Sequence, residues 1–379
     1  MKILIAGDFC PQYRVAERFE KEDYSFVLGA IKPTIEEVDY SIVNLECPVT
    51  KGSEKPIVKQ GSNLKCTKKA IDALKWCGFD CVTLANNHFL DYGEEGVANT
   101  LEACTEVGID VVGGGMSLQE SSRVLYRDIN GKMLAIINCC EHEFSIATDK
   151  TAGSNPLNPI QQYYAIEGAR EKADYVLVIV HGGNEHYQLP SPRMQETYRF
   201  FIDAGADAVV NHHQHCYSGY EIYNEKPIFY GLGNFCFDKN KKRNIEWHEG
   251  YVLILQFDQS NVGFSMIPYN QCSEDATIIK TDETSFDGCI KKLNAIISDR
   301  SQLSEMFKRY NMQKLRSTNL ILEPLTNRYV RALQQRGFLP KFFYSEKYVL
   351  RLYNFIKCEA HKDKIDFYLD YLLKSKKIP

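Results

Sequence analysis

Residues 1–10 read MKILIAGDFC, and this stretch sets the pattern on which the fold is built. Its apolar run, Lys2–Ala6, predicts a buried β-strand that ends at Gly7-Asp8. A second strand is expected at Tyr40–Asn44, and Glu46 follows shortly after it. Each of these strands therefore delivers a carboxylate where its apolar run ends.

Helices and strands alternate in the residues that follow. Helical spacing predicts helices at Cys66–Cys77 and Gly93–Val107, while strands are expected at Cys81–Leu84 and Ile109–Val112. The first of these strands runs directly into Asn87-His88. This alternating order predicts a largely parallel sheet with helices on its faces, so we assign the chain to the α/β class.

Two later strands end at histidines. The apolar run Asp174–Val180 is followed by His181, and Asp207–Val210 leads into the segment that carries His213 and His215. These strands extend the same pattern into the second half of the chain.

Beyond about residue 217 the pattern changes twice. Short runs typical of antiparallel strands continue to about residue 268, and segments with helical spacing and many lysines and arginines follow. We therefore divide the chain into a first domain, residues 1–270, and a C-terminal helical accessory module, residues 271–379.

Polar, metal-capable side chains thus follow five strand ends. Ligands of α/β sheets bind outside the carboxyl ends of the parallel strands, so these side chains are expected to converge on one crevice. Carboxylate, amide and imidazole donors with no required thiolate suit Mn, Fe, Zn or another divalent ion. The candidates are Asp8, Glu46, Asn87, His88, His181, His213 and His215.

Each candidate also has a simple structural explanation. An aspartate after a first strand, such as Asp8, is often a turn residue or a helix cap, and His181 beside two glycines can be a hydrogen-bonded histidine without a ligand role. His213 and His215 can instead lie in a solvated loop. Period-two spacing on an extended segment would place both imidazoles on the same side, which favours a ligand pair.

Composition argues against several other classes of protein. The formal net charge of -4 and the sequence pI of about 6.2 provide no general attraction to nucleic acid or to an anionic membrane. No apolar run approaches the roughly 20 residues of a membrane span, and the first run is too short for a secretory signal. The 13 cysteines include no CxxC pair, so free thiols in the cytoplasm are expected. The oligomeric state is not indicated.

The order of the polar motifs resembles that of a known family. It looks like the CapA-type family, which is named for poly-γ-glutamate capsule synthesis and is a branch of the calcineurin-like metallophosphoesterase superfamily. The resemblance covers about residues 1–270. The motifs that carry it are Gly7-Asp8, Asn44-Leu45-Glu46, Asn86-Asn87-His88 with Asp91 and Gly93, His181-Gly182-Gly183-Asn184-Glu185, Gly205-Ala206-Asp207, His212-His213-Gln214-His215 and Tyr230-Gly231-Leu232-Gly233-Asn234-Phe235.

This resemblance implies a four-layer α/β/β/α metallophosphoesterase-like sandwich with a site for two divalent ions. Carried over by position, Asp8 would bind the first ion, Glu46 would take the place of the bridging acid, and Asn87 would bind the second ion. His88 would face the leaving group or the reacting oxyanion. The imidazoles that complete the two ligand shells would be His181, His213 and His215.

Other motif residues are open to more than one interpretation. Asp91 either caps the helix that follows it or orients His88. Glu185 is a ligand or a substrate contact, and Asn44 is also expected to contact substrate. His186, next to Glu185, is expected at the surface.

Three positions depart from the pattern of the family. Cys10 stands where the wider superfamily has a histidine two positions after its first aspartate, Glu46 replaces an aspartate, and Gln214 replaces the proline that is usual in the CapA-type motif. A site with a single ion, or a site without turnover, therefore stays open.

Two functions fit these residues. The first is a metal-dependent hydrolase that cleaves a phosphoester or an acyl or amide bond in capsule or surface-polymer metabolism, with hydroxide generated at neutral pH. The alternative is a non-catalytic metal-binding component of surface-polymer biosynthesis. A nuclease is disfavoured by the acidic balance, although the basic C-terminal tail keeps this third function open. We expect a small-molecule or polymer substrate, no nucleic-acid partner and no membrane span.

Overall fold

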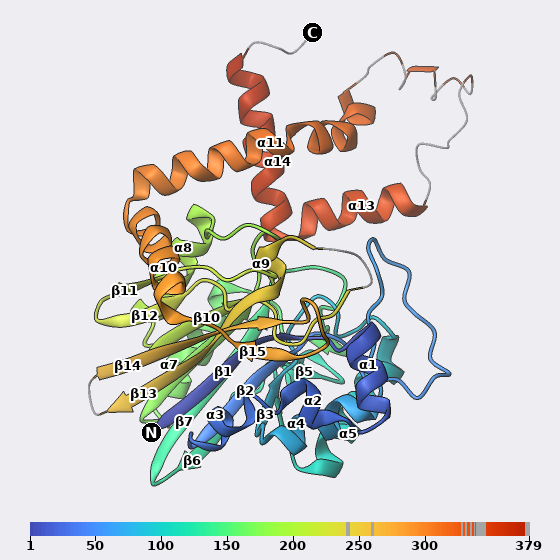
Figure 1. Ribbon diagram of the computed structural model, residues 1–379. Coiled ribbons are helices and arrows are strands. Elements are labelled where there is room, and N and C mark those ends of the chain that lie inside the picture. The colour runs from blue at the N-terminus through green and yellow to red at the C-terminus, as the bar shows by residue number, and fades with distance from the viewer. Residues whose placement is uncertain are drawn as a thin grey trace.

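Two β-sheets lie face to face in the computed structural model, and helices cover the outer face of each sheet (Figure 1). The structure describes residues 1–239, 243–258, 261–326 and 346–375, together with residues 329, 332, 333, 336 and 338. The α/β class and the four-layer α/β/β/α arrangement expected from the sequence are confirmed.

The first sheet has seven strands in the order β15-β14-β13-β1-β2-β3-β4. The strands β1 to β4 are parallel, and β13, β14 and β15 add antiparallel strands on the other side of β1. Their bounds are β1 Lys2–Phe9, β2 Tyr40–Leu45, β3 Cys81–Thr83, β4 Asp110–Val112, β13 Glu249–Asp258, β14 Asn261–Gln271 and β15 Ile278–Lys280.

The second sheet has six strands in the order β11-β12-β10-β9-β7-β6. Its four central strands are parallel, and an antiparallel strand lies at each edge. A separate two-stranded ribbon is formed by β5 Gly114–Gly115 and β8 Gly153–Ser154. The bounds of the six strands are β6 Leu125–Ile129, β7 Lys132–Cys140, β9 Tyr175–His181, β10 Ala208–His212, β11 Tyr220–Tyr223 and β12 Lys226–Phe229.

Alternation along the strands separates three apolar layers. In β1, Ile3 and Ile5 point between the two sheets, whereas Leu4 and Ala6 point toward the helices that cover the first sheet. The strands of the second sheet alternate in the same way between the middle layer and their own helices. Because the central strands are buried on both faces, each sheet is held in register on both sides, which fixes where these strands end.

The helices divide between the two outer layers. The first five pack on the first sheet, and α7 and α8 pack on the second. Ser191 caps α8 by accepting a hydrogen bond from the Met194 N–H at 3.2 Å, as the Ser-Pro pair at its start predicts. The bounds are α1 Tyr13–Glu20, α2 Tyr24–Leu28, α3 Lys32–Glu36, α4 Lys68–Cys77, α5 Gly93–Val107, α6 Leu118–Ser121, α7 Pro159–Arg170, α8 Pro192–Asp203 and α9 Ile245–His248.

A helical extension follows the last strand, as expected, although β15 of the first sheet lies within the range 271–379 that the sequence assigned to the helical module. The helix α10 packs against β11 and β14, and α11 runs on to contact α8 and α14 (Figure 1). The helix α13 lies against α14. The bounds are α10 Glu283–Ser298, α11 Arg300–Thr326, α13 Glu346–Lys357 and α14 Glu359–Ser375.

Two features bear on the environment of the chain. All 13 cysteines are free thiols, and all except Cys289 are buried. Among the described residues, no helix is both long and apolar enough to span a bilayer. The cytoplasmic location expected from the cysteines stays a prediction.

A close backbone approach fixes the end of β1. The Asp8 N–H donates to the Gly233 carbonyl oxygen at 3.2 Å, and the Phe235 N–H donates to the Asp8 carbonyl oxygen at 2.7 Å. A Cβ atom at Gly7 would lie 2.0 Å from the same Gly233 oxygen. The glycine is therefore required for the segment after β12 to reach β1 and hold Asp8 in place.

We predict that Gly7→Ala destabilises the protein by about 3 kcal/mol, because overpacking against backbone atoms cannot be relieved by side-chain rotation. The matched control is Gly168→Ala, since a Cβ atom at this α7 position meets nothing within 4 Å. The control should be stabilising by about 0.5–1 kcal/mol. Urea unfolding of both variants measures the difference, and equal midpoints would contradict the steric account.

Candidate metal centre

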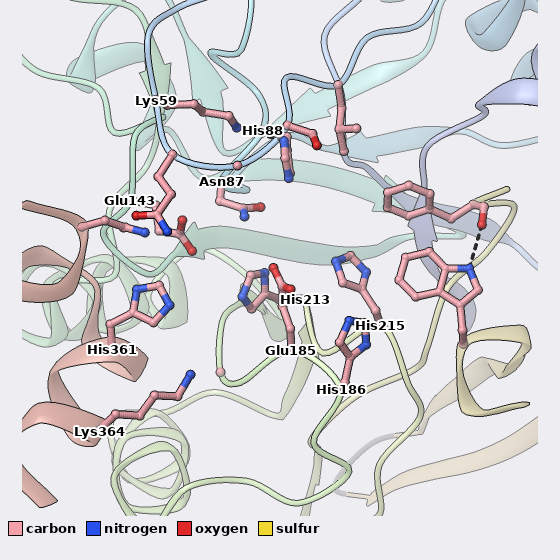
Figure 2. A pocket seen from close by; sticks show the side chains of 18 of the residues that line it. Lys59, Asn87, His88, Glu143, Glu185, His186, His213, His215, His361 and Lys364 are labelled. Atoms are coloured by element: carbon pink, nitrogen blue, oxygen red, sulfur yellow. Dashed lines mark hydrogen bonds between the residues drawn. The ribbon is translucent and has the colours of Figure 1, made fainter. Parts of the chain in front are cut away.

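The side chains that follow the strand ends lie together at one edge of the sandwich. Asp8 lies near the end of β1, Glu46 follows β2, and His181 ends β9. The segment after β3 supplies an amide, and the segment after β10 supplies two imidazoles (Figure 2). The buried residues brought together are Asp8, Glu46, Asn87, His181, His213 and His215.

Glu46 carries the clearest sign of an interaction with a cation. It is fully buried, and neither carboxylate oxygen has a hydrogen-bond partner among the described residues. Its Oε1 lies 3.8 Å from His181 Nε2 and 3.6 Å from His215 Nε2. Burial, with the Asp8 charge in second place, raises the pKa of Glu46 well above its usual value. A buried carboxylate in this state is stable only with a proton or a bound cation.

Two groups of ligand atoms meet at this carboxylate. One group is Glu46, His181 and His213, and the other is Asp8, Glu46 and His215; the ligand atoms of each group lie within 4.8 Å of one another. Burial and the neighbouring His213 lower the pKa of His181 well below its usual value, which favours the neutral imidazole that a metal ion requires. Both groups can therefore hold a divalent ion, with Glu46 shared between them.

Asp8 is oriented by its neighbours. Its Oδ1 accepts a hydrogen bond from Asn44 Nδ2 at 2.7 Å, and its Oδ2 accepts one from the His213 N–H at 3.2 Å. Burial raises the pKa of Asp8 to about 6. The Asn44 amide also lies 3.3 Å from His181 Nδ1, and Asn44 is 1% exposed. This placement fits a residue that positions two ligands and speaks against the substrate contact expected for Asn44.

Asn87 points its carbonyl oxygen at the group around His181. Its Oδ1 lies 3.1 Å from His181 Nε2, and the same Nε2 lies 3.0 Å from His213 Nδ1. Asn87 also lines the cavity above the site. The amide oxygen therefore lies beside two imidazoles of the cluster, and its role as a ligand stays a prediction.

The segment after β10 reaches the site by a different route from the one expected. Sequence spacing suggested an extended segment, but β10 ends at His212, and both His213 and His215 have positive φ angles, of 89° and 54°. Such angles cost energy for residues other than glycine. The Asp8 carboxylate, which accepts the His213 N–H, holds this turn so that both rings face the centre.

Gln214 anchors the same turn, which gives its departure from the family pattern a structural role. Its Nε2 donates to the Tyr187 carbonyl oxygen at 2.9 Å and to the Leu189 carbonyl oxygen at 3.2 Å. The His186 N–H in turn donates to the Gln214 carbonyl oxygen at 2.8 Å. These bonds tie the glycine-rich segment after β9 to the histidine turn after β10.

His88 stands beside the centre and is held by a charged pair. Its Nδ1 lies 2.6 Å from Asp91 Oδ2, and Lys59 forms an ion pair with Asp91 Oδ1. Asp91 also accepts the Leu64 N–H at 2.6 Å, whereas Tyr92 is the N-cap residue of α5 and makes no side-chain cap hydrogen bond. The helix-cap interpretation of Asp91 is therefore wrong, because its carboxylate is engaged with His88, Lys59 and Leu64.

A cavity of about 470 Å³ opens over these residues. Glu185 lies on its wall, and His186 is exposed at the surface, as expected, with its ring 6.1 Å from the His215 ring. Several residues on the wall were not anticipated from the sequence, because they lie in irregular segments or in the helical extension. They are Lys59, Lys239, Arg243, Tyr310, Lys314, His361 and Lys364.

His212 is a further buried residue that sequence reasoning left unassigned. Its Nδ1 lies 3.7 Å from Asp8 Oδ1, and neither ring nitrogen has a hydrogen-bond partner among the described residues. The only sequence signal was its place beside His213 in a histidine-rich motif. Cys10, where the superfamily has a histidine, is buried and accepts a hydrogen bond from Gln12 Nε2 at 3.4 Å.

We predict that His213→Ala and His215→Ala each lower the affinity for divalent metal by more than the roughly 10- to 100-fold that loss of a supporting residue commonly gives. The matched control is His186→Ala, since this neighbouring histidine is exposed and belongs to neither ligand group. Elemental analysis after dialysis in chelator-free buffer measures the bound metal. Equal loss in all three variants would refute the ligand assignment.

Comparison with known proteins shows the family of the part of the chain that carries this site. A family model described as bacterial capsule synthesis protein PGA_cap matches residues 2–239. The capsule biosynthesis protein CapA of Bacillus anthracis is 32% identical over 251 residues, which cover 64% of this chain and 61% of that protein. The PGA biosynthesis protein CapA of Bacillus subtilis (strain 168) is 32% identical over 240 residues, covering 62% of this chain and 63% of that protein.

The match therefore spans only about three fifths of these relatives. Among solved structures, a 5'-nucleotidase precursor from Thermus thermophilus gives a TM-score of 0.44 at 11% sequence identity, covering 79% of this chain and 59% of that chain. A score this low does not establish a common fold. The four-layer arrangement is therefore assigned from the two sheets and their helices alone. The family model, by contrast, covers more than half of the chain and contains both ligand groups. The chain belongs to the family of bacterial capsule synthesis proteins.

Proposed function

We propose that the protein is a metal-dependent hydrolase that cleaves a phosphoester or an acyl or amide bond. The observation that carries this proposal is the buried Glu46 carboxylate, which has no hydrogen-bond partner among the described residues and is shared by two groups of ligands beneath a cavity. The cavity provides room for a substrate directly above the ligands. A purely structural cluster would not need to be accessible in this way.

We propose that the site binds two divalent ions, of Mn, Fe or Zn. Asp8, Glu46 and His215 would hold one ion, and Glu46, His181 and His213 would hold the other with the help of the Asn87 carbonyl oxygen. When bound, such ions polarise a substrate oxygen and lower the pKa of water toward about 7. The donor set suits these ions, since it combines carboxylates with neutral imidazoles.

His88 would be the residue of this chain that faces the leaving group. Asp91 accepts a hydrogen bond from Nδ1 and leaves Nε2 for the cavity, so the ring can pass a proton to a leaving oxygen or stabilise charge on it. Lys59 forms a buried ion pair with Asp91 and so fixes the position of this carboxylate. Asp91 and Lys59 are thus positioning residues for His88.

The relatives suggest where such an activity would operate. Their names refer to capsule and PGA biosynthesis. We therefore propose a role in the metabolism of a capsule or another surface polymer, with a small-molecule or polymer substrate. The alternative function, a metal-binding component without turnover, predicts bound metal and no hydrolysis of any compound in a panel of phosphoesters, γ-glutamyl amides and acylated sugars.

We predict that Asn87→Ala loses metal, whereas His88→Ala keeps its metal and loses turnover by about 10²- to 10⁴-fold, the usual contribution of a general acid. Metal analysis and hydrolysis of the best compound in the panel measure the two effects. If His88→Ala matches wild type in both metal content and rate, His88 has no catalytic role. Loss of both metal and turnover in His88→Ala would instead make it a ligand.

The shared position of Glu46 leads to a separate prediction about stoichiometry. Glu46→Gln keeps the shape of the side chain but removes its charge, so both ions should be lost. His215→Ala removes a ligand from one group only, so one ion per chain should remain. Titration of metal-free protein with Mn²⁺ gives the number of sites, and a wild-type value of one would contradict the two-ion proposal.

A further inference from the structure

Hydrogen bonds and an ion pair connect the start of α14 to the segments that follow β7 and β9 of the second sheet. The Glu359 carboxylate accepts hydrogen bonds from the His142 N–H at 2.7 Å and from His142 Nδ1 at 2.5 Å. Asp363, one turn further along, pairs with Arg193 at 2.9 Å. The hydrogen bond to Glu359 raises the pKa of His142, which strengthens this contact.

Glu141 contacts both Arg193 and the backbone at the start of α14. Its Oε1 pairs with an Arg193 guanidinium nitrogen at 2.6 Å, and its Oε2 accepts the Ala360 N–H at 3.2 Å, which satisfies a free amide at the start of the helix. Glu141 is 4% exposed. Charged groups buried to this degree with complementary partners define one docked position, unlike exposed ion pairs. The helix is therefore a fixed wall of the site.

This docking turns one face of α14 toward the metal centre. His361 and Lys364 are three residues apart, so they share that face, and Figure 2 shows both side chains directed into the cavity from the side where Glu143 also lies. The His361 ring stacks on Phe355 with centroids 4.9 Å apart, and its Nδ1 is buried with no hydrogen-bond partner among the described residues.

Among the described residues, Lys364 has no carboxylate partner of the kind that a half-buried ammonium normally has. Its Nζ lies 5.8 Å from the centre of the Tyr310 ring, and within the described part of the chain it forms no ion pair with a carboxylate. Burial lowers the pKa of Lys364. A cation held in this way is best compensated by an anion that enters the cavity.

The cavity wall as a whole favours an anion. Among its described lining residues are five lysines and arginines, namely Lys59, Lys239, Arg243, Lys314 and Lys364, and two glutamates, namely Glu143 and Glu185. Lys59 is already paired with Asp91, whereas Lys364 faces the open space. The excess of positive charge on the wall therefore includes at least one cation placed for a ligand.

We propose that His361 and Lys364 form a subsite for an anionic group of the substrate, a carboxylate or a phosphoryl group that lies apart from the bond that is cleaved. Lys364 supplies the charge, and His361 supplies a ring nitrogen for a hydrogen bond. This inference rests on the proposed function, since it places a substrate between α14 and the metal centre. Both residues lie outside residues 2–239, so the helical extension would set specificity for a site built by the family domain.

The test uses the full-length, metal-loaded protein and probes of known structure. The probes are unbranched α,ω-dicarboxylates from succinate to suberate, each compared with the monocarboxylate of equal length. The series varies the distance between the two carboxylates and so reports a second anionic contact over that range of spacings. The analogous phosphonocarboxylates show whether the subsite prefers a phosphoryl group. Affinities come from calorimetric titration.

Lys364→Met removes the charge and keeps most of the side chain. Its matched control is Lys362→Met on the same helix, because Lys362 is exposed and does not line the cavity. We expect at least one dianion to bind wild type and Lys362→Met about tenfold or more tightly than its monoanion, and this preference to disappear in Lys364→Met. His361→Gln, which retains a hydrogen-bond donor, should weaken the preference less.

Two results would contradict the proposal that His361 and Lys364 form an anion subsite. One is equal binding of every dianion and its monoanion by wild type, and the other is equal loss of preference in Lys362→Met and Lys364→Met with unchanged melting temperatures. Failure of the proposed function looks different, because the dianion preference would then be present while no compound in the hydrolysis panel is cleaved. That combination supports an anion-binding site without turnover.

Discussion

The buried carboxylate of Glu46 is the constraint on which the site depends. It lies at the end of a strand that is buried on both faces, and its oxygens have no hydrogen-bond partner within the described structure. Leaving such a group unpaired costs several kcal/mol, on the order of the penalty for a buried ion. The imidazoles of His181 and His215 face it as neutral donors, so a divalent cation at this point would satisfy the carboxylate and the imidazoles together.

The fold makes this arrangement possible by stacking two sheets whose parallel strands end at the same edge. The first sheet delivers Asp8 and Glu46, and the second delivers His181 and the turn that carries His213 and His215. Neither sheet alone supplies a complete ligand group. The apolar layer between the sheets therefore sets the distances in the site, and the strained turn after β10 is held by the Asp8 carboxylate across that layer.

The sequence predicted which polar residues lie together because strand ends are local features. An apolar run followed by Asp8 or His181 is visible in the sequence, and the carboxyl-end rule for parallel strands brings such residues together without knowledge of the packing. The two interpretations of Asp91 could not be separated in this way, since its partners Leu64 and Lys59 lie in an irregular segment between β2 and α4. The conformation of His213 was missed because the contact that imposes it comes from Asp8 at the end of β1, which is far away in the sequence.

The contribution of the helical extension was also beyond sequence reasoning. His361 and Lys364 carry no motif, and the contacts that position them join residues more than 200 positions apart, such as His142 and Glu359. Helical spacing predicted that helices would follow the sheets but not which face would meet the cavity. This wall adds to the excess of positive charge around the site, and it lies outside the part of the chain that the family model describes.

The most direct test of the central claim is a crystal of the protein grown with Mn²⁺ and measured at the manganese absorption edge. We expect two anomalous peaks in the buried site, one beside Asp8 and His215 and the other beside His181 and His213, with Glu46 in contact with both. Fully loaded crystals with no peak within coordination distance of Glu46 would contradict it.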